Sequence, residues 1–289
     1  MKKLISALVL GMSFVGSAVA ADLIEPPVID APEPIVHVEQ AGGWYIRGDV
    51  DYGWLNTKGI DYDVLTGTAS FNSAKLKGAF SAGAGFGYQV NDYFRTDLTL
   101  NYHFKSDFRG STSGFCAETP AGGGAATFTA GCVSSDVASA KVYTLLASAY
   151  ADLGHYSGFT PYVGAGIGGA HVSWGDLTNT ATCTATTGNV CVPTVAYTHK
   201  GISGMRFAYA LHAGTSYDIS SNLKLDAGYS WTHVNGGDMF RFKGLAPGHV
   251  DDTGVMGRDK GINIHEVRVG LRYQFGGSSA GCCGGPVYK

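Results

Sequence analysis

The sequence predicts an all-β fold, namely an eight-stranded antiparallel transmembrane β-barrel with short periplasmic turns and long extracellular loops. Three observations lead to this prediction. Segments of roughly ten residues alternate apolar and polar side chains with a period of two, which is typical of strands with one apolar and one polar face. Eight such segments occur along the chain. The connections between them are alternately long and short, which is typical of outer-membrane barrels.

The first 20 residues have the layout of a secretory signal peptide. Lys2 and Lys3 precede an apolar run, and the small residues Ala18-Val19-Ala20 close it. A short apolar run with a cleavage motif favours a cleaved signal peptide over a spanning helix. We therefore expect cleavage between Ala20 and Ala21, export, and a location in the outer membrane of a Gram-negative cell.

Residues 21–43 are predicted to form a periplasmic linker, because the segment is rich in proline, carries five acidic side chains and has no basic one. Such a composition buries too little apolar surface to order itself. The barrel is expected over 44–275, and residues 276–289 form a tail that contains glycine and cysteine.

The first predicted strand, 44–54, separates charged from apolar side chains. Ile46 and Val50 fall on one face, whereas Arg47 and Asp49 fall on the other. About 11 residues are enough for a tilted strand to cross a bilayer. The same alternation predicts strands at about 75–88, 94–104, 143–152, 161–168, 205–217, 223–232 and 264–275.

Two of these strands fit the pattern less well. Leu146 breaks the alternation, and 161–168 is too rich in glycine for its faces to be assigned. Long polar loops are expected at about 105–136, 175–204 and 235–263. The alternative fold is a soluble lipocalin-like barrel, which would turn the apolar faces inward and gives no reason for aromatic side chains at the strand ends.

The inward faces of a transmembrane barrel carry the charged side chains. Eight strands enclose an interior that side chains can fill, and buried charges are costly unless they are paired. We therefore predict a plugged polar lumen rather than an open pore. The lumen ionic network is expected to contain Arg47, Asp49, Asp51, Arg95, Asp97, Arg206, Asp226, Glu266, Arg268 and Arg272, with Lys75, Lys77, Asp152 and Lys224 on the same faces.

Three stretches resemble the eight-stranded outer-membrane surface proteins of alphaproteobacteria, OmpA-like barrels often labelled "porin family". They are GWYIRGDVDYG at 43–53, PYVGAGIG at 161–168 and VRVGLRYQF at 267–275. The resemblance implies a barrel over about 44–275, an outer-membrane location, and Phe275 as the terminal strand aromatic that the barrel assembly machinery recognises. Family barrels usually stop at this aromatic, whereas here the chain continues to Lys289.

Four cysteines are candidates for disulfides, because export places them in an oxidising compartment. Cys116 and Cys132 lie in one predicted external loop, and Cys183 and Cys191 lie in the next. Four cysteines allow three connectivities, and pairing within each loop is expected because it closes the shortest rings. The disulfide that closes the first ring lowers the entropy of the unfolded chain and so stabilises the fold by about 3 kcal/mol. The remaining pair, Cys282 and Cys283, is suited to links with another chain or to free thiols.

The sequence offers weak signals for catalysis or cofactor binding. His171-Val172-Ser173 has the His-x-Ser spacing of barrel lipid hydrolases, but a carboxylate to orient the histidine is missing nearby. The nine histidines show no metal-ligand spacing. His199 and His249 are the loop histidines that a haemin-binding alternative would use. We predict no catalytic residue, no metal and no cofactor.

The predicted function is that of a non-enzymatic envelope protein whose external loops contact a host or cell-surface ligand. The alternatives are a narrow pore for small solutes and, third, a lipid-modifying barrel enzyme. Expected partners are outer-membrane lipid, lipopolysaccharide and the barrel assembly machinery. Removing Lys2 and Lys3 from the 20 basic residues leaves 18 against 23 acidic ones. This net negative charge argues against nucleic-acid binding.

Overall fold

The described part of the computed structural model comprises residues 42–64, 67–192, 196–241 and 254–275. Several predictions fall outside these ranges, namely those on Ala20, Ala21, residues 21–41 of the linker, His249, the tail 276–289, Cys282 and Cys283. Among the described residues, no helix is long and apolar enough to span a bilayer.

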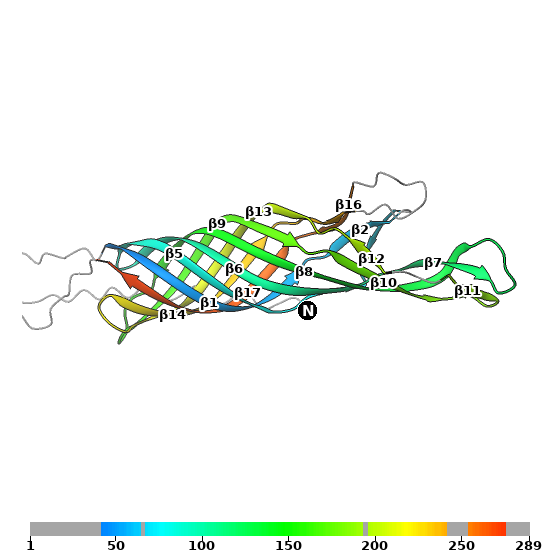
Figure 1. The fold of residues 1–289 in the computed structure, drawn as a ribbon. Helices are drawn as coiled ribbons and strands as arrows, with labels where there is room; N and C mark the ends of the chain where they lie inside the picture. The colour runs from blue at the N-terminus through cyan, green and yellow to red at the C-terminus, as the bar shows by residue number, and fades with distance from the viewer. Residues whose placement is uncertain (1–41, 65–66, 193–195, 242–253, 276–289) are drawn as a thin grey trace, which may run out of the picture. The chain divides into compact units, whose positions relative to one another are not determined.

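Eight antiparallel strands form a closed ring, and they run tilted side by side (Figure 1). In ring order they are β1 (Gly43–Thr57), β5 (Ala79–Asn91), β6 (Phe94–Ser111), β8 (Thr127–Asp152), β9 (Phe159–Trp174), β13 (Ser203–Asp218), β14 (Leu223–Val234) and β17 (Ile262–Gln274). The ring closes because β17 pairs with β1 as well as with β14. The predicted fold class, an eight-stranded antiparallel transmembrane barrel, is confirmed.

The charged side chains of the ring point inward and the apolar ones point outward. On β1, Arg47 is 5% exposed and Asp49 is 4% exposed, whereas Ile46 is 50% exposed and Val50 is 61% exposed. The strand period of two fixes this orientation, because a slip by one residue would turn every charge to the outside. The orientation excludes the lipocalin-like alternative.

Aromatic side chains gather at the two ends of the outward faces. At the turn end, the rings of Trp44 and Tyr88 lie 5.1 Å apart on neighbouring strands. At the opposite end, the rings of Tyr52 and Phe80 lie 5.0 Å apart. Amphipathic rings favour the membrane–water interface, so these clusters mark the edges of the bilayer.

Short turns join the ring strands at the periplasmic end. They lie between β5 and β6, between β8 and β9, and between β13 and β14, close to the positions that the sequence predicts. Gly154 and Gly158 have positive φ angles of 110° and 89°, which a glycine adopts without strain. The chain therefore enters β1 and leaves β17 on the same side as these turns.

The opposite end is more ordered than the sequence predicts, because the long loops contain regular strands. A separate four-stranded sheet contains β2 (Ile60–Val64), β3 (Gly67–Ser70), β15 (Gly237–Arg241) and β16 (Val255–Asp259). The other added strands are β4 (Ser73–Leu76), β7 (Ser113–Pro120), β10 (Leu177–Thr184), β11 (Asn189–Cys191) and β12 (Tyr197–His199). The long connections expected at about 105–136, 175–204 and 235–263 are therefore confirmed, but they contain strands that the sequence does not predict.

The predicted strand at 75–88 is also wrong at its start. Leu76 points inward and Ser81 points inward, so the faces are exchanged between β4 and β5. Lys75 and Lys77 consequently lie outside the lumen, and Lys77 forms an exposed ion pair with Asp107 at 3.5 Å. The apolar Leu76 takes the inward position because it packs in an apolar cluster at this end of the ring.

This apolar cluster, here called the plug, fills the outer part of the lumen and its mouth. Its ring-strand members include Leu146, Val172, Trp174 and Ile264, all inward and buried. Phe108 and Phe240 complete it, with ring centroids 5.8 Å and 5.7 Å from that of Trp174. Leu146, which breaks the alternation in the sequence, is one of these plug residues.

Candidate functional site

The part of the lumen between the plug and the periplasmic mouth, here called the lower lumen, holds a network of buried ion pairs. Arg47 lies at its centre and bridges two carboxylates, with Nη2 2.8 Å from Asp49 Oδ1 and Nη1 2.9 Å from Asp97 Oδ2. Arg268 pairs with Asp51 at 3.0 Å. Because β1, β6 and β17 supply these residues, the pairs connect strands from different parts of the ring.

Further pairs extend the network toward the periplasmic end. Arg272 Nε lies 3.3 Å from Asp226 Oδ2. Arg95 Nε lies 3.1 Å from Asp152 Oδ1. The Arg95 guanidinium also lies over two aromatic rings, those of Tyr150 at 4.4 Å and Tyr162 at 4.6 Å. These cation–π contacts accompany the ion pair.

Glu266 joins the network through a histidine. Its Oε1 lies 3.0 Å from His103 Nδ1 and accepts a hydrogen bond of 2.7 Å from Ser81. Arg206 lies apart from these groups. It pairs with Asp259 of β16 at 2.6 Å and donates to the carbonyl of Asp238, so it attaches the outer sheet to the ring rather than filling the lower lumen.

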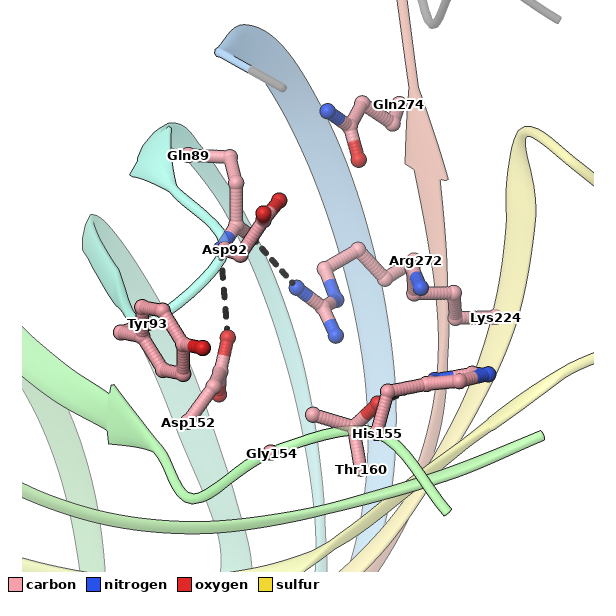
Figure 2. Close-up of a pocket in the computed structure, with 10 residues that line it drawn as sticks. All are labelled: Gln89, Asp92, Tyr93, Asp152, Gly154, His155, Thr160, Lys224, Arg272 and Gln274. Atoms are coloured by element: carbon pink, nitrogen blue, oxygen red, sulfur yellow. Dashed lines mark hydrogen bonds between the residues drawn. The ribbon is translucent and has the colours of Figure 1, made fainter. Parts of the chain in front are cut away.

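A pocket of about 300 Å³ opens at the periplasmic mouth of the barrel (Figure 2). At one wall, Gln89 links the two charged sides of the mouth. It accepts a hydrogen bond of 3.3 Å from Arg272 and donates one of 3.2 Å to Asp152. At the rim, Lys224 pairs with Asp218 at 2.5 Å. Arg272, Asp152 and Lys224 are thus bound to other polar groups at the mouth.

Beyond the opposite end, four strands form an arm in the order β11-β7-β8-β10. Disulfides join Cys116 to Cys132 and Cys183 to Cys191, so the arm is cross-linked within each of its two loops. Cys183 lies directly opposite Cys132 across β8 and β10. The two disulfides therefore come together in the interior of the arm.

The charged side chains of the arm point inward. Over 112–140 and 177–191, the charged residues are Glu118 and Asp136, which are 0% and 1% exposed. Asp136 accepts hydrogen bonds from Ser134 at 2.6 Å and from Asn179 at 2.5 Å. Since these carboxylates are enclosed, the described outer surface of the arm carries no charge.

Several large apolar side chains are exposed on that outer surface, among threonines, serines and glycines. Phe115 is 75% exposed and Phe128 is 74% exposed, and further exposed apolar side chains of the arm are Val133, Val137 and Val190. Exposed apolar patches on soluble surfaces usually mark interaction sites. From the sequence alone, this surface is only a Gly/Thr/Ala-rich loop. Which side chains face outward becomes clear once the pairing of β7, β8 and β10 is known.

The Glu118 carboxylate is held in its charged form by hydrogen bonds. The Thr129 hydroxyl donates at 2.6 Å, and the Thr186 backbone N–H and hydroxyl each donate at 2.7 Å. These bonds lower the pKa of Glu118 to about 2. A carboxyl group with a lowered folded-state pKa stabilises the fold above its ordinary pKa and loses that contribution as the pH falls through the lowered value.

We therefore expect the contribution of Glu118 to the stability of the arm to be fully present above about pH 4.5 and to be lost as the pH falls toward about 2. The measurement is an NMR titration of the Thr186 amide in detergent micelles. Its chemical shift should change with a midpoint near pH 2, and Glu118→Gln should abolish the change. A midpoint near pH 4.5 would show that these hydrogen bonds are absent.

Among the described residues, the ring contact of His171 and the hydrogen bond of Ser173, the two catalytic candidates, do not join them to a carboxylate. Ser173 accepts a hydrogen bond of 2.7 Å from Ser203, and the ring of His171 lies 6.5 Å from that of Tyr143. Neither contact supplies the carboxylate that a nucleophile–base–orienter arrangement needs. His199 is buried at 5% exposure on β12.

A family model described as "Outer membrane protein beta-barrel domain" matches residues 7–275. The chain belongs to this family. Family membership and the closed ring confirm the resemblance noted in the sequence, the outer-membrane location and the character of an envelope surface protein.

Several known proteins are similar to this chain over most of its length. An uncharacterized protein of Brucella abortus is 36% identical over 90% of this chain and 94% of its own length. A Rickettsia bellii protein named as a candidate adhesin is 27% identical over 80% of this chain and 87% of its own length. The crystal structure of Neisserial surface protein A is 16% identical, with a TM-score of 0.41, over 81% of this chain and 97% of that chain.

Proposed function

We propose that this protein is a closed, non-enzymatic barrel that presents its arm to the surface of another cell. The observation that carries the proposal is the contrast between the two ends of the ring. The lumen is filled by paired charges and by the plug, whereas the arm exposes Phe115 and Phe128 on a surface without charges. A filled lumen leaves the external surface as the working part of the molecule.

The exposed phenylalanines favour an apolar or uncharged partner. Burial of a phenylalanine side chain contributes about 1.5–3 kcal/mol, so two of them supply a substantial part of the affinity of a weak contact. Inward carboxylates avoid the desolvation cost that exposed ones would incur at such a contact. The name given to the Rickettsia bellii relative agrees with this role.

The remaining partners follow from the outer surface of the ring. The apolar band between the aromatic clusters contacts outer-membrane lipid, and lipopolysaccharide is the lipid that the outer half of the band meets. Phe275 is 49% exposed at the end of β17, and its N–H donates to the Trp44 carbonyl at 2.8 Å. We propose this exposed terminal aromatic as the group that the barrel assembly machinery recognises.

The test compares wild-type protein with the Phe115→Ser/Phe128→Ser variant, both reconstituted in lipid nanodiscs and titrated onto cultured cells. Losing two apolar anchors should weaken binding at least tenfold. The matched control is Thr180→Ser/Thr182→Ser, which changes two exposed residues of the same arm and should bind as wild type. Wild-type affinity in the folded phenylalanine variant would refute the role of the arm.

A further inference from the structure

Four cysteine side chains from four strands of the arm meet in one cluster. The Sγ atoms of Cys116, Cys132 and Cys183 lie within 4.8 Å of one another, and Cys191 is bonded to Cys183. Each disulfide therefore has a sulfur atom of the other disulfide beside it. This proximity permits a different covalent pairing without separating the strands.

The second pairing with suitable geometry is Cys132 with Cys183. They are directly opposite across β8 and β10. Opposite residues of antiparallel strands have Cα atoms about 4.5–5.5 Å apart, which lies within the range of about 4.4–6.8 Å that a disulfide spans. This bond would join the two loops of the arm, which the present pairs do not.

The other two cysteines are less suited to one another. Cys191 lies opposite Glu118 across β11 and β7, two residues from Cys116 along the same face. Diagonal neighbours of this kind have Cα atoms about 7–8 Å apart, which is beyond the usual reach of a disulfide. Once Cys132 and Cys183 are joined, the remaining two sulfurs are left for other partners.

We propose that the arm is a thiol–disulfide exchange site, which takes an external thiol as a mixed disulfide and cross-links its own two loops in return. The ligand class is a small or protein-borne thiol at the surface that the arm contacts. The external thiol attacks Cys191 or Cys116, whose side chains are half-buried, because Cys132 is 8% exposed and shielded by its neighbours.

The exchange is balanced and involves no net oxidation. An external thiolate attacks the Cys191 sulfur, forms a mixed disulfide there and breaks the bond to Cys183, which leaves as a thiolate. The Cys183 thiolate attacks the Cys132 sulfur, forms the cross-loop disulfide and breaks the bond to Cys116. The Cys116 thiolate then takes up the proton that the external thiol released. Attack at Cys116 gives the same cross-link, with the mixed disulfide on Cys116 and the thiol on Cys191.

Trypsin distinguishes the two pairings. Cleavage at Arg109, Lys141 and Lys200 yields fragments 110–141 and 142–200, and each contains one of the present disulfides. The fragments are separate in the present pairing and become linked if Cys132 bonds to Cys183. The folded protein, with Cys282→Ser and Cys283→Ser to remove other thiols, is incubated with glutathione, blocked by alkylation and digested for mass spectrometry.

We expect the linked pair of fragments to appear with glutathione and to carry one glutathione adduct and one alkylated cysteine. Recovery of only separate fragments, whether oxidised or fully reduced, would overturn the proposal. A second measurement uses Cys116→Ser/Cys191→Ser in the same background, where Cys132 and Cys183 should form a disulfide on air oxidation. Cys132→Ser/Cys183→Ser is the control and should keep two free thiols. Two free thiols in both variants would also overturn the proposal.

Discussion

Replacing Arg47 with methionine should lower the free energy of unfolding by about 3–5 kcal/mol, because removing one partner of a buried ion pair leaves the other charge uncompensated. The loss falls at the upper end of this range, because Arg47 neutralises two carboxylates, Asp49 and Asp97, at 2.8 Å and 2.9 Å. Urea unfolding in detergent micelles, followed by the mobility difference between folded and unfolded barrels on gels, measures the change.

The control for this prediction is Lys77→Met. Lys77 also pairs with an aspartate, Asp107, but both side chains are more than half exposed. An exposed ion pair contributes roughly 0–1 kcal/mol, so this variant should unfold close to wild type. If the two variants lost the same small amount, the lower lumen would be hydrated rather than filled by paired charges.

Replacing Phe240 with alanine should lower the free energy of unfolding by about 3–5 kcal/mol, because a buried phenylalanine leaves a cavity that its neighbours fill only in part. Phe240 is 0% exposed and packs against Trp174 and Phe108 in the plug. The loss should show as a lower urea midpoint and as faster cleavage of the outer sheet by protease.

Phe115→Ala is the matched control for the plug. Phe115 is the same residue type, lies on the same side of the membrane and is 75% exposed. Its truncation removes little buried surface, so the stability should change by less than about 0.5 kcal/mol. Equal stability losses at Phe240 and Phe115 would contradict the existence of a packed apolar plug.

The ring can be predicted from the sequence because the period of two in each strand indicates which side chains face the lumen and which face the lipid. Alternation over β1 and β17 is strict, and it separates Arg47 and Arg268 from Val50 and Val269 without reference to any other strand. The pairing register then places apolar side chains beside apolar ones and charged side chains beside charged ones, since Val50 lies opposite Val269 and Asp51 opposite Arg268. The charges of the lumen are therefore predictable as a set, although their individual partners are not.

The plug is not predictable in the same way, because its residues break the polar-inward rule. Leu146 and Ile264 sit at inward positions and are apolar, which the alternation alone treats as an irregularity. They belong to one buried cluster with Phe108, near the outer end of β6, and with Phe240 of β15. A contact between segments so distant in sequence has no local signal.

The arm escapes prediction for a related reason. The Gly, Thr and Ala residues of the arm, over 112–140 and 177–191, give little local indication of strands, and pairing between two separate loops supplies their strand structure. The positions of the cysteines in the sequence predict one disulfide within each loop. Their meeting in one cluster depends on the register of β8 with β10, which places Cys132 opposite Cys183.

Single-channel recording of the purified protein in planar lipid bilayers tests the closed lumen most directly. The protein should be shown to be inserted and folded by its heat-modifiable mobility. With the ion pairs below and the plug above, we predict a current that stays at the baseline of the protein-free bilayer over a range of voltages. Stable, large conductance steps from the folded protein would contradict the closed lumen and would favour a pore for small solutes.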